Sequence, residues 1–144
     1  MPKPAKQQTI VVALTVDQSY AIGAAVTIAS LADHIPKDLG LEVWLLHIGL
    51  DHAQLGLISR AVARGKGRLH TFELSAAQLG PPIQSDYISG ATYGRLYLGE
   101  ILPPECKRLL YLDCDVLVRG DLRELLSTDY AVAWWQLCRS RRCP

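Results

Sequence analysis

The segment Thr-Ile-Val-Val-Ala-Leu-Thr-Val at residues 9–16 is an unbroken run of apolar or β-branched residues. A strand with one solvated face alternates apolar and polar side chains, whereas a strand covered on both faces stays apolar along its length. The segment therefore predicts a strand buried on both faces. The run ends at Asp17-Gln18-Ser19, and either Asp17 or Ser19 is suited to cap a following helix.

Strand and helix patterns alternate along the rest of the chain. We expect helices at 21–35, 51–63 and 91–102, and further strands at 41–49, 69–74 and 108–112. Asp51 is placed to cap the second helix and Gly65 to end it. This alternation predicts an α/β fold with a mostly parallel sheet flanked by helices. Right-handed crossovers bring the carboxyl ends of such strands to one edge, where ligands bind.

Two acids stand inside the apolar segment Leu-Leu-Tyr-Leu-Asp-Cys-Asp-Val-Leu-Val at residues 109–118. They repel each other unless a cation or a bound proton stabilises them. In an extended backbone, Asp113 and Asp115 point to the same side and Cys114 points away. Such a pair can converge on one divalent ion, and oxygen ligands favour Mn²⁺ or Mg²⁺ over zinc. The alternative is an Asp-x-Asp in a solvated turn that binds no metal.

Two further positions are candidates for ligand binding. The turn after the first strand, Thr-Val-Asp-Gln-Ser-Tyr at residues 15–20, lacks the GxGxxG of dinucleotide-binding folds. It could hold a nucleoside, with Tyr20 as a flat surface for base stacking, or Tyr20 could simply pack locally. Arg95 stands near an expected helix start and suits bidentate contact with phosphate, although a surface arginine is the simpler interpretation.

Composition limits the classes of protein that this chain can be. With 144 residues, 49% hydrophobic and 20% charged, it has the size and composition of one globular domain. A net charge of +1 gives no reason to expect a nucleic-acid partner. No apolar run reaches the length of about 18 residues needed for a membrane span, and residues 1–9 are too polar for a secretion signal. We expect a cytoplasmic protein with reduced cysteines, or one peripheral to the inner face of a membrane.

Three segments together resemble glycosyltransferase family 8, which contains lipopolysaccharide galactosyl- and glucosyltransferases and the glycogenins. They are Ile-Val-Val-Ala-Leu-Thr-Val-Asp-Gln-Ser-Tyr-Ala, Ser-Gly-Ala-Thr-Tyr-Gly-Arg-Leu-Tyr-Leu-Gly-Glu-Ile-Leu-Pro and Lys-Arg-Leu-Leu-Tyr-Leu-Asp-Cys-Asp-Val-Leu-Val-Arg-Gly-Asp-Leu. The resemblance covers residues 9–129. It implies a Rossmann-like GT-A fold, a UDP-glucose or UDP-galactose donor, Mn²⁺ dependence and transfer with retention at the anomeric carbon. Lipopolysaccharide or other glycan synthesis, with a glycan or lipid-linked acceptor, is the implied setting.

The resemblance assigns the nucleoside to the end of the first strand. It implies that the main chain around Leu14, Thr15 and Val16 and the side chain of Asp17 hold uracil and ribose. Tyr20 would stack on the base.

The resemblance assigns the diphosphate to the other two segments. Arg95 would reach the phosphate and sugar of the donor. Asp113 and Asp115 would ligate Mn²⁺, with Mg²⁺ as an alternative, across the diphosphate. Main-chain atoms of Cys114 would lie near the ribose.

The chain departs from the family toward its end. Family members are longer, and their second half supplies a histidine as third metal ligand, much of the acceptor pocket and the residues around the reacting carbon. We therefore expect the catalytic residues outside this chain. We expect a polar segment at residues 1–8, a nucleotide-sugar-binding region at 9–130 and an atypical tail at 131–144. A frameshifted or prematurely ended reading frame explains the tail, and an authentic short tail that docks on the sheet or another chain is the alternative.

Two rival functions remain at this point. Residues 112–117 also resemble the first motif of haloacid-dehalogenase-type phosphatases, but that fold has the motif on its first strand and needs a later lysine, and none follows Lys107. The second rival is an inactive remnant that binds a UDP-sugar without turnover. Truncation would leave a sheet edge uncovered, so self-association is expected.

Overall fold

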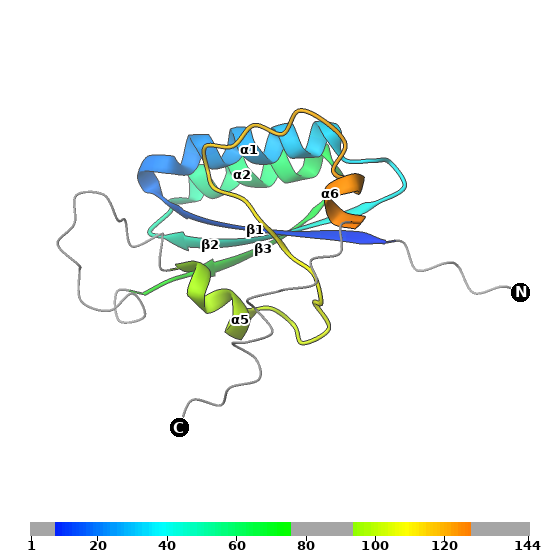
Figure 1. The fold of residues 1–144 in the computed structure, drawn as a ribbon. Coiled ribbons are helices and arrows are strands. Elements are labelled where there is room, and N and C mark those ends of the chain that lie inside the picture. The colour runs from blue at the N-terminus through cyan, green and yellow to red at the C-terminus, as the bar shows by residue number, and fades with distance from the viewer. Residues whose placement is uncertain (1–7, 76–93, 128–144) are drawn as a thin grey trace, which may run out of the picture.

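The computed structural model describes residues 8–75 and 94–127 of the chain (Figure 1). The first described part contains β1 (Thr9–Asp17), a 3-10 turn η1 (Gln18–Tyr20), α1 (Ala21–His34), β2 (Gly40–Ile48), α2 (His52–Arg64) and β3 (Arg68–Glu73). The second contains a 3-10 turn η2 (Arg95–Tyr97), α5 (Leu98–Ile101), β4 (Leu110–Tyr111) and α6 (Arg123–Ser127).

The four strands form one parallel sheet in the order β3-β2-β1-β4. β1 pairs with β2 along nine residues, from Thr9 opposite Gly40 to Asp17 opposite Ile48. On its other edge β1 pairs with β4 only at Val12 and Ala13. The chain thus runs outward from β1 to β3 and then returns to the far side of β1. The strand order reverses between β1 and β4, which is where open α/β sheets bind ligands.

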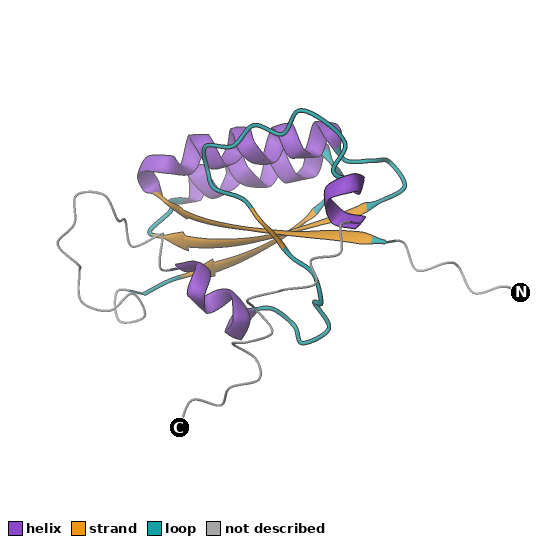
Figure 2. Ribbon diagram, in the orientation of Figure 1, coloured by secondary structure: helices purple, strands orange, loops and turns teal. Residues whose placement is uncertain are grey.

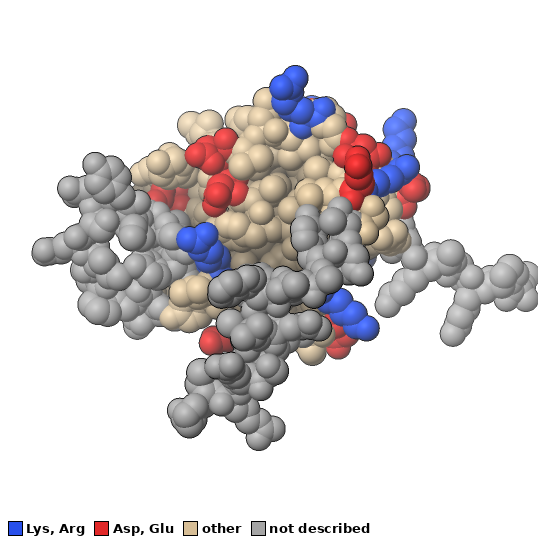
Figure 3. All heavy atoms as spheres, viewed as in Figure 1, with Lys and Arg blue, Asp and Glu red and all other residues tan. Residues whose placement is uncertain are grey.

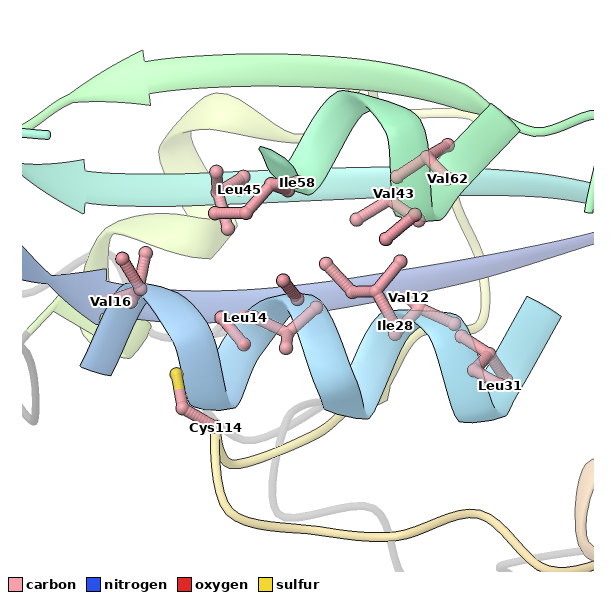
Figure 4. Packing of buried hydrophobic residues seen from close by; sticks show 14 of the residues in the cluster. Val12, Leu14, Val16, Ile28, Leu31, Val43, Leu45, Ile58, Val62 and Cys114 are labelled. Carbon is pink, nitrogen blue, oxygen red and sulfur yellow. The ribbon is translucent and has the colours of Figure 1, made fainter. Parts of the chain in front are cut away.

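Helices cover both faces of the sheet (Figure 2), with α1 and α2 on one face and α5 on the other. On the α1 side, Val12 and Leu14 of β1 pack with Ile28 and Leu31 of α1, and all four are fully buried (Figure 4). On the α5 side, Ala13 belongs to a second buried cluster with the following residues: Trp44, Leu46, Leu74 and Leu98. The prediction that the first strand is buried on both faces is confirmed.

The helix ends follow the local sequence signals only in part. Asp51 caps α2 in a capping box, because its Oδ1 accepts from Gln54 N at 2.7 Å while Asp51 N donates to Gln54 Oε1 at 3.0 Å. Gly65 ends α2, as expected. The expected cap of α1 is wrong in detail: Asp17 caps the 3-10 turn η1, and α1 itself has no side-chain cap.

The segment after residue 94 differs most from the predicted elements. In the described part of the expected 91–102 helix, a 3-10 turn leads into the short α5. The expected 108–112 strand has only two residues, and α6 was not expected. The predictions for residues 1–7, 76–93 and 128–144 lie outside the described residues, so the domain limits and the atypical tail stay predictions. In the described parts, no helix has the length and apolarity that crossing a membrane requires.

Two isoleucines of α1 provide a matched test of the core. Ile28 is fully buried, whereas Ile22, one and a half turns earlier, is 72% exposed. We predict that Ile28→Ala lowers the free energy of unfolding by about 2–5 kcal/mol. Ile22→Ala should change it by less than about 0.5 kcal/mol. Urea unfolding followed by circular dichroism measures both, and equal losses would contradict the packing described.

Candidate functional site

The ends of β1 and β4 meet where the strand order reverses, and both ends carry acids. Asp17 is the last residue of β1, and Asp113 follows the end of β4 by two residues. In the view of Figure 3, acidic side chains gather on the side of the molecule where the strands end, with a basic side chain beneath them. The predicted shared edge is therefore present.

The acid pair follows the strand, as expected, but it lacks the extended backbone on which the placement of both carboxylates on one side was based. Beyond β4, a main-chain hydrogen bond from Leu112 N to Ala13 O at 3.0 Å still joins this segment to β1. Cys114 and Asp115 then form a turn. The strand ends because the main chain of residues 113–116 leaves the edge of β1 and turns toward α1. Thr27 Oγ1 donates there to the carbonyl oxygens of Cys114 at 3.0 Å and Val116 at 2.8 Å.

Cys114 anchors this turn in the core. Its side chain is buried, and its thiol donates to Thr15 O at 3.1 Å, whereas Asp113 and Asp115 are exposed (Figure 4). The two carboxylates thus stand in solvent on either side of a side chain held in the interior.

The pKa of Cys114 identifies which charges surround it. Burial chiefly raises this pKa to about 12, and the negative charges of Asp113, Asp17 and Asp115 raise it further, in that order. Carboxylates that follow two neighbouring strands thus lie within electrostatic reach of one thiol. That they share a crevice stays a prediction.

Arg95 belongs to the same neighbourhood. Burial chiefly raises the pKa of Tyr111, the negative charge of Asp113 raises it further, and the positive charge of Arg95 lowers it. Arg95 thus lies within electrostatic reach of Tyr111, two residues before Asp113. Its side chain is exposed at the start of η2.

Gly94 brings η2 close to β1. A Cβ at Gly94 would lie 2.3 Å from Thr15 Cγ2, a distance that no side chain tolerates. The side chains of Leu14 and Val16 are fully buried and that of Thr15 is 5% exposed. These exposures are those of whole residues, so the main chain of this strand end is covered as well. The main-chain contact with a nucleoside that the resemblance implies stays a prediction.

The turn after β1 presents Tyr20 to solvent. Asp17 Oδ1 accepts from Ser19 N at 2.9 Å and from Tyr20 N at 3.2 Å, which fixes the turn. The Tyr20 side chain is 55% exposed, so it is not a core residue. Gln18 donates to the carbonyl oxygen of Gly49, which has a φ of +62° and ends β2.

Several residues that shape this site were not predicted from the sequence. Gln18 and Gly49 tie the two strand ends together, and Gly94 permits close approach of η2. Thr27 and Ser30 hold the turn of the acid motif. Their spacing on α1 was visible, but nothing in the sequence says which segment a helix face meets.

The acids suit a hard divalent cation as part of a larger ligand set. Asp113, Asp115 and the neighbouring Asp17 offer oxygen atoms only, the chemistry that Mn²⁺ and Mg²⁺ prefer. In residues 8–75 and 94–127, no three His, Cys, Asp or Glu side chains form a group that could hold a metal by themselves. The acid pair fits a cation whose remaining ligands come from elsewhere, including a bound phosphate.

The helix-flanked parallel sheet has the GT-A fold of glycosyltransferases. The solved structures that match it agree. The chain is similar to an active-site mutant of LgtC with a TM-score of 0.69 and 32% identity, over 85% of this chain and 42% of that one. It is similar to the galactosyltransferase LgtC in complex with donor and acceptor sugar analogs with a TM-score of 0.66 and 31% identity, over 85% and 43% of the two chains.

The family model "Glycosyl transferase family 8" matches residues 11–143, so the chain belongs to this family. The lipopolysaccharide 1,2-glucosyltransferase of Escherichia coli is 25% identical to it over 87% of this chain. The chain spans 37% of the length of that relative, and less than half of each LgtC chain. Neither the family match nor these similarities support the phosphatase alternative.

The buried thiol gives a prediction about reactivity. At pH 8 a thiol with a pKa of about 12 is roughly 1,000-fold less ionised than one at the ordinary value of 9.0. We predict that iodoacetamide modifies Cys114 much more slowly than the less buried Cys106, as measured by peptide mass spectrometry. Of the three carboxylates, Asp113 has the largest effect on the pKa of Cys114. Asp113→Asn removes this charge, so it should lower the pKa of Cys114 and speed its modification. Equal rates at the two cysteines would contradict the assignment.

Proposed function

We propose that this chain binds a UDP-sugar donor, UDP-glucose or UDP-galactose, together with Mn²⁺, as the donor-binding part of a retaining hexosyltransferase. The observation that carries the proposal is the placement of acids after two neighbouring parallel strands at the reversal point of the sheet: Asp17 ends β1, and Asp113 and Asp115 follow β4. All three acids act on the pKa of the Cys114 thiol. Mg²⁺ is the alternative ion, because both are hard cations that take oxygen ligands.

The nucleoside occupies the end of β1 in this proposal. Main-chain atoms around Leu14, Thr15 and Val16 and the carboxylate of Asp17 hold uracil and ribose. Tyr20 stacks on the base, for which the exposure of its ring is the supporting observation.

The diphosphate occupies the space between the acid motif and η2. Asp113 and Asp115 hold the cation, Arg95 approaches the phosphate and the sugar, and main-chain atoms of Cys114 lie near the ribose. When bound, the cation stabilises the negative charge that develops on the departing UDP, as a Lewis acid does. The exposed guanidinium of Arg95 adds positive charge on the same side.

The acceptor is a glycan or a lipid-linked glycan, in lipopolysaccharide or other glycan synthesis. The name of the Escherichia coli relative and the acceptor analog in the LgtC complex support this choice. We place the reaction in the cytoplasm, with the inner face of a membrane as the alternative. We expect the residues around the reacting carbon and a third metal ligand outside this chain, which spans 37% of the Escherichia coli relative and 42% of the LgtC chain.

A second candidate is a module that binds the donor without transferring its sugar. It is favoured by the acid group in the described residues, which does not by itself make a complete metal site. Titration with UDP and Mn²⁺ beside a donor-hydrolysis assay separates the two: binding without hydrolysis or transfer indicates the module. Light scattering of the same sample tests the expected self-association.

Metal dependence is the first test of the proposal. We predict that isothermal titration detects UDP binding with Mn²⁺ and little or none with excess EDTA. Asp113→Asn and Asp115→Asn should each weaken UDP binding by at least about 10-fold. Removing a residue that only orients a metal ligand already costs about 10-fold or more, and removing the ligand itself should cost no less. Asp38→Asn is the matched control, because Asp38 is exposed and pairs with Arg123 away from the site. Unchanged affinity with EDTA, or in both site variants, would refute the proposal.

Base stacking is the second test. Tyr20→Ala should weaken UDP binding by about 1–3 kcal/mol, equal to roughly 5- to 150-fold in Kd. Tyr20→Phe keeps the ring and should bind UDP as the wild type does. If Tyr20→Ala binds normally, the base lies elsewhere.

A further inference from the structure

One face of α1 meets the acid motif with small or hydroxyl-bearing residues. Gly23, Thr27 and Ser30 are spaced by four and three residues, which brings them to one side of a helix. This face adjoins, but differs from, the apolar face that packs on β1. We call these three residues the α1 clamp.

The two hydroxyls bind main-chain groups of the segment that follows β4. Thr27 is 1% exposed, and its Oγ1 lies 3.0 Å from Cys114 O and 2.8 Å from Val116 O. Ser30 Oγ accepts from Val118 N at 3.0 Å and donates to Thr27 O at 2.8 Å. These two side chains thus supply hydrogen bonds that a neighbouring strand would supply if residues 114–118 were part of the sheet.

Gly23 permits this contact. A Cβ at Gly23 would lie 2.7 Å from Cys114 O, so any side chain there would push the motif away from α1. The carbonyl of Cys114 is therefore held against the helix, while its thiol bonds to Thr15 O on β1.

Asp113 and Asp115 flank the residue that is held in this way. An irregular segment without sheet pairing is free to move unless other contacts hold it. The contacts of Thr27 with Cys114 O and Val116 O fix the main chain on both sides of Asp115 and directly after Asp113, which limits where each carboxylate can lie.

We propose that the α1 clamp positions Asp113 and Asp115 for the divalent cation. The clamp residues contact neither cation nor nucleotide and act only through the main chain of residues 114–118. The role in cation binding rests on the proposed function, whereas the holding of the segment does not.

Thr27→Val and Thr27→Ser form the decisive pair of variants. Valine keeps the shape and loses the hydroxyl, whereas serine keeps the hydroxyl and loses a methyl group. Ser30→Ala is the second variant, with Ser59→Ala as its control, because Ser59 is exposed on α2. Two quantities are measured on each full chain: hydrogen–deuterium exchange of residues 113–118 without ligand, and Mn²⁺ affinity in the presence of UDP by electron paramagnetic resonance.

We expect faster exchange of residues 113–118 in Thr27→Val and Ser30→Ala, with exchange in β1 and β2 unchanged. Mn²⁺ affinity should fall by roughly 10-fold or more, as for other residues that orient metal ligands. Thr27→Ser and Ser59→Ala should match the wild type in both measurements. Should Thr27→Val fail to fold, Ser30→Ala against Ser59→Ala carries the same comparison.

Unchanged exchange in both hydroxyl-deleting variants would overturn the inference, as would equal effects of Thr27→Val and Thr27→Ser. Faster exchange with unchanged Mn²⁺ affinity would also overturn it, because the carboxylates would then be positioned by something else. If the wild-type chain binds no UDP with Mn²⁺, the proposed function fails. The exchange comparison then still decides whether the clamp holds the segment.

Discussion

The structure depends on β1, a strand covered on both faces and paired on both edges. Such a strand excludes charged side chains, so polar chemistry is confined to its carboxyl end. Pairing with β4 covers only two residues, after which the neighbouring chain diverges from β1. The polar end of β1 and the polar residues after β4 therefore meet at one place. The position of the site is a consequence of how the core is built.

Acids that gather at such a place carry an electrostatic cost that must be offset. The turn after β1 stabilises the charge of Asp17, because two main-chain N–H groups of this turn donate to its Oδ1. Asp113 and Asp115 are exposed, so water solvates them. The neutral Cys114 thiol between them is the group that cannot ionise there, because it is buried and surrounded by negative charge. A bound cation would relieve the repulsion that the protein alone only tolerates.

The sequence predicted the core elements well because their signals are local. Hydrophobic patterns gave β1, β2, β3, α1 and α2 to within one or two residues, and Asp51 and Gly65 marked the ends of α2. The same logic overextended β4. A strand was expected at 108–112, but β4 contains only Leu110 and Tyr111, which pair with Val12 and Ala13 of β1.

The candidate acids were also predictable, because topology alone brings the ends of neighbouring parallel strands together. The residues that support them were not. Thr27 meets main-chain groups 87 and 89 residues away, and no periodic pattern records which partner a hydroxyl will find. The role of Gly94 was equally hidden in the sequence, because the side chain that a residue there would collide with belongs to Thr15, on a strand far away along the chain.

Helix α1 links the core to the acid motif through two adjoining faces. Ala24, Ile28 and Leu31 seat the helix on the sheet, and this packing determines how far the α1 clamp lies from residues 114–118. Close-packed interiors transmit displacement with little loss, so a change in the seating of α1 moves the main chain of the motif as well. Core packing and the geometry of the acid pair are therefore not separate properties of this chain. A substitution that loosens Ile28 against β1 would loosen the hold of Thr27 on Cys114 through the same helix.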